Sequence, residues 1–349
     1  MASEQPLPSI RERDIFFEAI LKKTPAECDA YLIESCGGDQ KLLESIKSLI
    51  EAYETGKNSG NILGANCFMQ SPEPPDNLTP GSVVEDFLIL NKIGPGGWGV
   101  VYKAQQKSVS REVALKVINP GISAQSVVER FNQEIKTLGA LKHPNIVNVI
   151  AGGSHLGRPY FAMEYVDGLP ITQYAEKINL TVQNRLRLFL QVCEAVHHAH
   201  EMGVVHRDLK PANILVTEET VGEPLVKVID FGIAKVVNNG LPLAYATQTG
   251  QPIGTPAYMS PEQTGETIEE VSESTDVYSL GVLLYELLVG KLPLEIKSSD
   301  KEQIKIIGEV TPLPPSKRVN EMNNDGFLLI AQKRGLDPTQ LKKMILGTS

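Results

Sequence analysis

The sequence predicts an α+β fold in which strands come first and helices follow. Residues 83–93 and 112–118 are apolar runs typical of β-strands. Residues 181–203 and 326–344 carry helical patterns instead. A small helical segment, described below, precedes both regions. The fold class that we expect is therefore α+β.

The same patterns divide the chain into three parts. Residues 1–55 are expected to form a small helical region. Residues 56–81 are expected to form a linker, because they are rich in Gly, Asn, Ser and Pro, and their prolines exclude regular helix. The main domain is expected over residues 82–349.

In the first part, apolar residues recur at helical spacing in three stripes. Thr24-Pro25 is a suitable helix start, and Gly37-Gly38 is a suitable stop. The stripes consist of Ile15, Phe16, Ala19 and Ile20; Tyr31 and Leu32; and Leu42, Leu43, Ile46, Leu49 and Ile50. We expect a small helical bundle here. Contact with a partner protein and a role in packing alone are the two alternatives for its purpose.

Composition and charge exclude several classes of protein. The chain has 349 residues, of which 42% are hydrophobic, as in soluble globular proteins. Its net charge of -9 argues against nucleic-acid binding, which requires a basic surface. The N-terminus lacks a signal pattern, and the longest apolar stretch, near residues 278–289, is too short to span a bilayer. Four scattered cysteines suit a reducing compartment, so we expect a cytoplasmic protein without a membrane segment.

A glycine-rich turn follows the first strand of the main domain. Gly94, Gly96 and Gly99 precede Val101 with the spacing G-x-G-x-x-G-x-V. Glycines let backbone amides approach phosphates closely. A strand follows the turn, which disfavours a dinucleotide-binding site, although an ordinary glycine-rich hairpin fits this pattern when it is taken alone.

The stretch 206–213 concentrates the polar groups that chemistry needs. Asp208 is suited to accept a proton from a hydroxyl, Lys210 to neutralise a phosphoryl group and Asn213 to bind a metal. A charged surface turn is the alternative interpretation, because loops are generally polar. Further along, an apolar strand ends in Asp230-Phe231-Gly232.

The helical pattern that leads into this loop predicts one buried face. Its apolar positions are Leu186, Phe189, Leu190, Cys193, Val196 and Ala199. His197, His198 and His200 point in different directions on such a helix, which disfavours a metal site.

With these motifs in this order, the chain resembles the bacterial, eukaryotic-type serine/threonine protein kinases. The motifs H-R-D-L-K-P-x-N and D-F-G, the glycine-rich turn and the lysine of the strand 112–118 carry the resemblance, which covers about residues 83–310. It implies a bilobal fold with a small antiparallel β lobe, which includes one helix, and a larger helical lobe. It also implies transfer of the γ-phosphoryl group of ATP to Ser or Thr hydroxyls of protein substrates.

The resemblance implies a catalytic role for Asp208, Lys210, Lys116 and Glu134, and metal binding by Asn213 and Asp230. Asp208 would orient and deprotonate the substrate hydroxyl, and Lys210 would offset charge in the transition state. Asn213 and Asp230 would hold Mg²⁺, with Mn²⁺ as an alternative metal.

The resemblance also implies the ATP site. Lys116, a lone ammonium in an apolar strand that requires an anionic partner, would contact the phosphates and pair with Glu134. The residues expected around the nucleotide are Gly94, Gly96, Gly99, Val101, Ala114, Lys116, Met163, Glu164 and Val166.

Residues 230–262 have the polar composition of a long loop and resemble an activation segment. Arg207 directly precedes Asp208, so a phosphate on Thr247 or Thr249 is expected to pair with it after autophosphorylation. Thr255 fits the part of the family pattern that lines the peptide-substrate site.

Two expectations concern the large lobe. Asp276 is expected to accept hydrogen bonds from backbone N–H groups of the catalytic loop, with a helix N-cap as the alternative role. We find no counterpart of the arginine that pairs with the glutamate at the position of Glu262 in this family, so the C-terminal end is expected to be incomplete or divergent. A pseudokinase-like nucleotide-binding scaffold or an inactive truncated kinase is therefore the alternative to an active enzyme.

Overall fold

The computed structural model describes the strand and helix regions of the main domain and part of the N-terminal region. The described residues are 15, 16, 19, 25–59, 78–96, 99–118, 133, 135–156, 158–220, 223–231, 256–264, 272–294, 306, 307, 310–322 and 324–346.

Within these residues, an antiparallel six-stranded sheet forms the first half of the main domain. Its strands lie in the order β1-β2-β3-β4-β6-β5. They span Val83–Val84 (β1), Phe87–Gly96 (β2), Gly99–Gln106 (β3), Arg111–Ile118 (β4), Val149–His155 (β5) and Arg158–Glu164 (β6). Alternate residues of a strand face opposite sides of the sheet. The side chains on one side form an apolar cluster around Phe87, Tyr102 and Leu115. The other side faces the rest of the domain.

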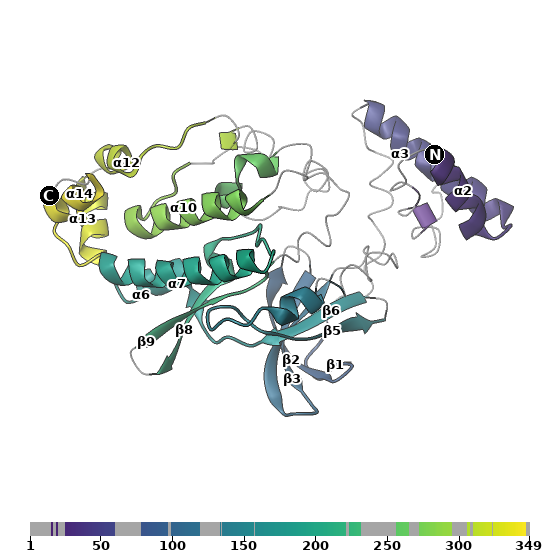
Figure 1. Ribbon diagram of the computed structural model, residues 1–349, viewed down its shortest axis with the longest axis horizontal. Helices are drawn as coiled ribbons and strands as arrows, with labels where there is room; N and C mark the ends of the chain where they lie inside the picture. Colours follow the sequence, from purple (N-terminus) through teal and green to yellow (C-terminus); the bar gives the residue numbers. More distant parts are fainter. Residues whose placement is uncertain are drawn as a thin grey trace, which may run out of the picture.

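The second half of the main domain is mainly helical. Figure 1 shows its C-terminal helices at the end remote from the six-stranded sheet. The helices are α6 (Ile171–Lys177), α7 (Val182–Glu201), α10 (Glu273–Val289), α12 (Pro315–Glu321), α13 (Asn324–Lys333) and α14 (Pro338–Leu346). A small antiparallel sheet of β7 (Leu169–Pro170), β8 (Ile214–Thr220) and β9 (Glu223–Val228) lies beside them.

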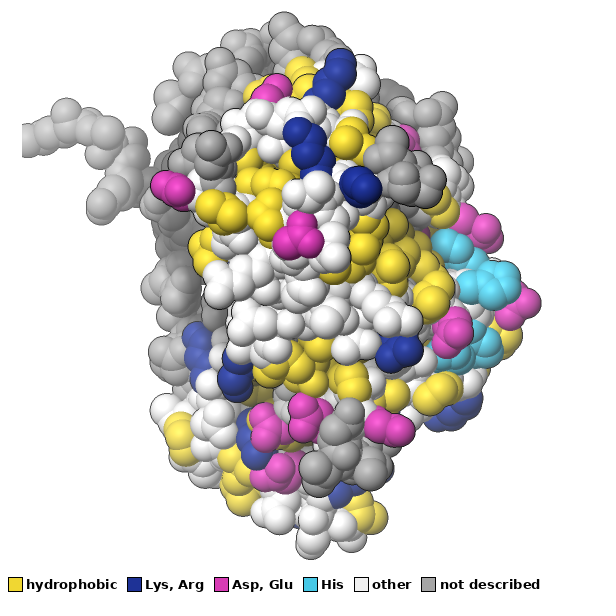
Figure 2. All heavy atoms as spheres, turned by 90° about the vertical axis from the view of Figure 1, so that its left-hand side faces the viewer, with side chains coloured by type: hydrophobic (Ala, Val, Ile, Leu, Met, Phe, Trp, Pro, Cys, Tyr) yellow, Lys and Arg dark blue, Asp and Glu magenta, His cyan; other side chains and the backbone are white. Residues whose placement is uncertain are grey.

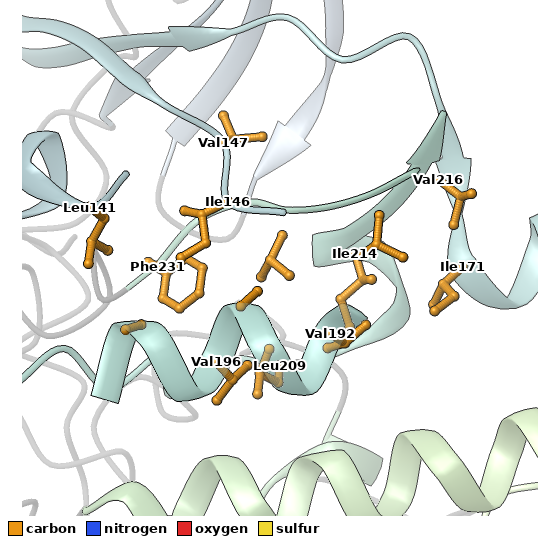
Figure 3. Packing of buried hydrophobic residues seen from close by; sticks show 14 of the residues in the cluster. Leu141, Ile146, Val147, Ile171, Val192, Val196, Leu209, Ile214, Val216 and Phe231 are labelled. Atoms are coloured by element: carbon orange, nitrogen blue, oxygen red, sulfur yellow. The ribbon is translucent and has the colours of Figure 1, made fainter. Parts of the chain in front are cut away.

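One apolar cluster joins the two halves. It contains Met163 of β6, Val192 and Val196 of α7, and Phe231 after β9. Figure 3 shows Phe231 beside Leu141 and Ile146, above α7. A backbone bridge between Ile146 and Val228 reinforces this junction. The segments that carry the predicted site residues therefore start from one shared apolar core.

Helix α7 forms where it was expected, but its buried face differs from the predicted one. The Thr181 hydroxyl accepts a hydrogen bond from Asn184 N–H and caps the helix, and Gly203 takes a left-handed φ of 72° after it. Leu186 and Leu190 were predicted to be buried but are 37% and 59% exposed. The buried residues are Val182, Arg185, Leu188, Val192, Ala195, Val196 and Ala199. The prediction failed because it followed apolar residue type, whereas a buried arginine occupies this face.

The N-terminal helices pack as the sequence predicts. Helix α2 (Pro25–Cys36) ends at Gly37 and Gly38, which have φ values of 57° and 86°. The cluster under it contains Ile15, Phe16, Ala19, Leu32, Cys36 and Ile46. Helix α3 (Gln40–Ser59) extends past residue 55, where we placed the start of the linker. The prolines that exclude helix begin only at Pro72, which explains this correction.

The C-terminal helices cover one side of α7 and α10. Val182 packs with Ala331 and Leu341, and Val289 packs with Val319. Figure 2 views this end of the molecule, where hydrophobic side chains lie open to view between charged ones. In α13 and α14, the side chains of Leu328, Leu329, Met344 and Leu346 are about half exposed.

Candidate active site

The inner face of the six-stranded sheet carries the residues predicted to surround a nucleotide. Ala114 and Lys116 alternate with core residues on β4 and therefore share this face. Val101 lies opposite Lys116 in the β3–β4 register, and Met163 lies opposite Ala114 in the β4–β6 register. Sheet pairing thus brings four predicted residues from three separate strands to one surface.

The glycines of the turn between β2 and β3 have different surroundings. A Cβ on Gly99 would lie 2.2 Å from the carbonyl oxygen of Val117, so only glycine fits against β4. A Cβ on Gly94 would have no atom of the other described residues within 4 Å. Gly96 pairs with Gly99 across the hairpin. Gly99 is therefore required by the sheet itself, whereas Gly94 leaves open space.

Lys116 forms an ion pair that joins the sheet to the D-F-G motif. Its Nζ atom lies 2.7 Å from Oδ2 of Asp230, and only 4% of its side chain is exposed. The prediction that this buried ammonium needs an anion is confirmed, but the anion in the structure is Asp230. Glu134, the partner that we predicted, lies outside the described residues.

Glu164 and Val166 follow β6, at the junction between the two halves. The Glu164 N–H donates to the carbonyl of Asn148 at 3.0 Å, and its Oε1 lies 3.0 Å from Nζ of the buried Lys227. Val166 packs against the central core. The backbone of this segment is therefore held at a defined position beside Met163.

The catalytic loop gathers its polar groups around Asp208. Lys210 Nζ donates to both carboxylate oxygens of Asp208, at 3.0 and 2.7 Å. Asn213 Nδ2 donates to the Asp208 backbone carbonyl at 2.7 Å and to its Oδ2 at 3.0 Å. Lys210 and Asn213 thus fix the orientation of the Asp208 carboxylate. The Asp208 side chain is still 41% exposed, so solvent can reach it.

His206 connects this loop to the D-F-G motif. Its Nδ1 faces the N–H of Asp208 at 3.2 Å, and its Nε2 lies 2.9 Å from the carbonyl of Ile229. An amide N–H requires an acceptor and a carbonyl requires a donor, so this arrangement corresponds to a neutral imidazole protonated at Nε2. The ring also packs on Phe231, with 4.6 Å between centroids.

Asp276 holds the catalytic loop through the loop's backbone N–H groups, which confirms the predicted contact. Its carboxylate accepts the N–H groups of His206 and Arg207, both at 2.8 Å, and contacts His200 Nε2 at 2.8 Å. The N-cap of α10 is Ser272, so the alternative role does not apply. Burial by itself raises the pKa of Asp276, but the contacts with His200, His206 and the backbone donors bring that pKa below its usual value.

The oxygen atoms of Asn213 and Asp230 suit a hard divalent cation. Asp230 has a left-handed φ of 63°, and its Oδ1 is buried without a hydrogen-bond partner among the described residues. Asn213 uses its amide nitrogen toward Asp208, which leaves its side-chain oxygen as the atom for a metal. Carboxylate and amide oxygens are the ligands that Mg²⁺ prefers.

Some of the predicted residues lie outside the described ranges, and one has a partner that the sequence did not predict. Thr247, Thr249 and Thr255 lie outside the described residues. Glu262 accepts a hydrogen bond from the Thr275 hydroxyl at 2.8 Å. Burial raises the pKa of Glu262, but its backbone contact and the Thr275 hydroxyl bring it below the usual value.

Sequence reasoning missed Gln263, which touches the catalytic loop. Its Nε2 donates to the carbonyl of Arg207 at 2.7 Å. It directly follows Glu262 in the chain, but a single glutamine carries no pattern that predicts this contact.

Comparison with known proteins agrees with the resemblance seen in the sequence. The family description "Protein kinase domain" matches residues 87–340. The chain is 35% identical over 234 residues to serine/threonine-protein kinase Pkn1 of Myxococcus xanthus, covering 67% of this chain and 33% of that protein. It is also 35% identical over 247 residues to serine/threonine-protein kinase PknB of Mycobacterium leprae, covering 69% of this chain and 38% of that protein. The chain thus spans well under half the length of these two relatives.

The fold matches a solved structure as well. The kinase domain of Mycobacterium tuberculosis PknI aligns with a TM-score of 0.53 and 22% identity, covering 78% of this chain and all of that one. The expected bilobal fold, with a sheet lobe and a helical lobe, is confirmed. Among the helices of the described ranges, none has the length and apolar character needed to cross a membrane.

Proposed function

Because the chain belongs to the protein kinase domain family, we propose that it transfers the γ-phosphoryl group of ATP to Ser and Thr hydroxyls of protein substrates. The observation that carries this proposal is the arrangement around Asp208. Lys210 and Asn213 hold its carboxylate, and Lys116 and Asp230 form an ion pair next to the same loop. The names of the relatives, which are serine/threonine-protein kinases, support the choice of hydroxyl.

Asp208 is the proposed base. The hydrogen bonds from Lys210 and Asn213 fix the direction of its carboxylate before a substrate arrives, which favours a reactive geometry. Its exposed side leaves room for the attacking hydroxyl, whose proton it accepts.

Lys210 is proposed to act on the other reactant. In this structure its ammonium contacts both oxygens of Asp208, and only 16% of its side chain is exposed. A cation at this place also attracts the γ-phosphoryl oxygens, and it offsets the negative charge that accumulates on them during transfer.

The inner sheet face is the proposed ATP site. Val101, Ala114 and Met163 offer apolar contact to the adenine base, and the backbone of residues 164–166 offers hydrogen bonds to its edge. Gly94 leaves space for phosphates beneath the turn, and Lys116 supplies the positive charge that positions them.

Asn213 and Asp230 are the proposed metal ligands. The buried Asp230 Oδ1 and the side-chain oxygen of Asn213 are the donor atoms. When bound, Mg²⁺ neutralises charge on the phosphate oxygens.

We also propose that the chain phosphorylates its own activation segment, residues 230–262. Thr247 and Thr249 are the candidate acceptors, and Arg207 is the candidate partner of the resulting phosphate. Mapping of incorporated phosphate by mass spectrometry tests this step.

The test of the proposed function is transfer of labelled γ-phosphate, with Mg²⁺ and ATP, to the chain itself and to a generic protein substrate. The parent chain is expected to incorporate label, and Asp208→Asn is expected to reduce the rate by about 1,000-fold or more, because the general base is lost. Asp337→Asn, which makes the same change on an exposed helix start, is the control and is expected to behave as the parent.

Thermal shift with ATP and Mg²⁺ completes the experiment. If ATP raises the melting temperature but the parent transfers no label, the active-kinase proposal fails, and a nucleotide-binding scaffold is left. If label is incorporated equally by the parent and by Asp208→Asn, the assignment of the base fails.

A further inference from the structure

The residue before the proposed base has an unusual backbone conformation. Arg207 has a φ of 68°, in the left-handed region that side chains with a Cβ rarely adopt. Such a conformation persists only where the surroundings hold it. The peptide group that joins Arg207 to Asp208 sets the direction in which the Asp208 side chain leaves the backbone, so contacts to this group bear directly on the base.

Hydrogen bonds hold this peptide group at both of its ends. Its carbonyl oxygen, from Arg207, accepts from Gln263 Nε2 at 2.7 Å. Its N–H, from Asp208, donates to Nδ1 of His206 at 3.2 Å. Because a peptide group is planar, fixing the carbonyl end and the N–H end fixes the orientation of the whole plane.

The amide of Gln263 is itself held in one orientation. Its Oε1 accepts from the backbone N–H of Ser260 at 3.0 Å and from the Ser260 hydroxyl at 3.3 Å. The oxygen therefore faces donors, and the nitrogen faces the Arg207 carbonyl, which is the only assignment that satisfies both ends.

The segment that carries Gln263 is anchored to α10. Gln263 belongs to the short helix η3 (Pro261–Thr264), which follows η2 (Pro256–Tyr258). The Tyr258 carbonyl accepts from the Ser279 hydroxyl at 2.8 Å, and Glu262 accepts from the Thr275 hydroxyl at 2.8 Å. Since α10 also supplies Asp276 to the N–H of Arg207, one helix controls both sides of the strained residue.

We propose that Gln263 is a positioning residue, whose side-chain amide orients the Arg207–Asp208 peptide group and thereby the catalytic base. The proposal rests on the proposed kinase function. It assigns to Gln263 the role of a hydrogen-bond donor. If Gln263 only packed η3 in place, the size of its side chain would matter but its N–H group would not.

Two variants separate these roles. Gln263→Met keeps the approximate size and removes the donor. Gln263→Glu keeps the acceptor toward Ser260 but turns a carboxylate oxygen toward the Arg207 carbonyl. For both, we expect kcat to fall by between about ten- and a hundredfold and the KM for ATP to stay within about twofold, because the base is displaced while the ATP site is intact.

The pH dependence of Gln263→Glu gives a signature that a packing role lacks. A protonated glutamic acid can donate to the Arg207 carbonyl as glutamine does. The ratio of Gln263→Glu activity to parent activity should therefore rise as the pH is lowered from about 8 to about 5.5, whereas the Gln263→Met ratio stays flat. Gln340→Glu, the same change at an exposed glutamine on α14, is the matched control and should match the parent throughout.

Hydrogen exchange at the Asp208 amide tests the proposal independently of catalysis. Loss of the Gln263 donor loosens the peptide plane, so this amide should exchange faster in Gln263→Met than in the parent or in Gln340→Glu. Unchanged kcat in Gln263→Met, or unchanged exchange at Asp208, overturns the proposal. If the parent transfers no phosphate, the proposed function fails, and the exchange rate at Asp208 alone decides the role of Gln263.

Discussion

Lys116 and Asp230 lie 114 residues apart in the chain, and their side chains form an ion pair of 2.7 Å at the centre of the candidate active site. The lysine comes from β4 of the sheet lobe, and the aspartate follows β9 of the helical lobe. This contact links the proposed phosphate ligand to the proposed metal ligand. It therefore ties the two halves of the domain together where transfer is proposed to occur.

We expect Lys116→Met to reduce phosphate transfer by about 100-fold or more, because it removes the cation that is proposed to position the phosphates and it leaves Asp230 without this partner. Label incorporation under saturating ATP measures this effect. Lys103→Met is the matched control, since Lys103 lies on the neighbouring strand with 23% of its side chain exposed and pairs with Glu112. Equal losses in the two variants would contradict the role of Lys116.

Asp276→Asn should destabilise the domain by about 2–4 kcal/mol at neutral pH, because asparagine offers one acceptor oxygen where three donors converge on a buried carboxylate. Urea unfolding measures the change. Asp337→Asn is the control, because Asp337 caps α14 on the surface and asparagine is also a good cap. A loss of less than about 0.5 kcal/mol in Asp276→Asn would contradict this prediction.

The contribution of Asp276 should also depend on pH in a defined direction. Its folded-state pKa lies below the usual value of 3.8, so the unfolded chain binds this proton more readily than the folded chain. The stabilisation is therefore complete above the unfolded pKa and is lost as the pH falls through the folded pKa. The difference in unfolding free energy between the parent and Asp276→Asn should be constant near neutral pH and shrink below about pH 4. A difference that grows on acidification would contradict it.

Two glycines of the same turn should respond differently to alanine. Gly99→Ala should destabilise the domain by about 2 kcal/mol or more, because its Cβ meets the β4 backbone at Val117. Gly94→Ala should leave the melting temperature unchanged, because the space around it is open, while raising the KM for ATP. Thermal unfolding and ATP titration measure the two effects. A stable Gly99→Ala protein would show that the hairpin shifts to accommodate the methyl group.

Arg334→Ala should be more damaging than its neighbour Lys333→Ala. Arg334 is 1% exposed and donates to the carbonyls of Leu287 and Leu288 at the end of α10, where burial lowers the pKa of Arg334 to about 10. Its loss should cost about 2–4 kcal/mol, because buried carbonyls lose their donor. Lys333 is 37% exposed and pairs with Glu176, so its loss should cost less than about 1 kcal/mol. Urea unfolding compares the two.

Much of the site could be predicted from the sequence because its motifs are local. Asp208, Lys210 and Asn213 lie within six residues of one another, so a short loop brings them together wherever the domain places it. The resemblance implied the residues around the nucleotide, and strand alternation explains why Ala114 and Lys116, two positions apart, share one face. The spacing of Gly94, Gly96 and Gly99 likewise predicted a turn between two strands.

Long-range pairing escaped prediction because nothing in local spacing specifies it. The sequence indicated that Lys116 needs an anion but did not predict its contact with Asp230, 114 residues away. The partner that the resemblance implied, Glu134, lies outside the described residues and stays a prediction. The buried face of α7 was misassigned at Leu186 and Leu190 because the chain buries Arg185, whose guanidinium reaches carbonyls of α6 and α10. Apolar periodicity cannot register a polar residue that is buried with partners.

The apolar patterns of the sequence predicted the α+β class, and the resemblance carried by its motifs implied the bilobal fold. The catalytic loop and the chemistry of its functional groups could be predicted because they depend on neighbours a few positions away. The proposed orientation of the base depends instead on Asp276 and Gln263, which contact Arg207 at its N–H and at its carbonyl, from two other segments of the chain. These two contacts form only when α10 and η3 have packed beside the catalytic loop. They could not be predicted from the sequence, because nearly every residue has the same backbone N–H and carbonyl groups, and a hydrogen bond to them requires no particular residue type.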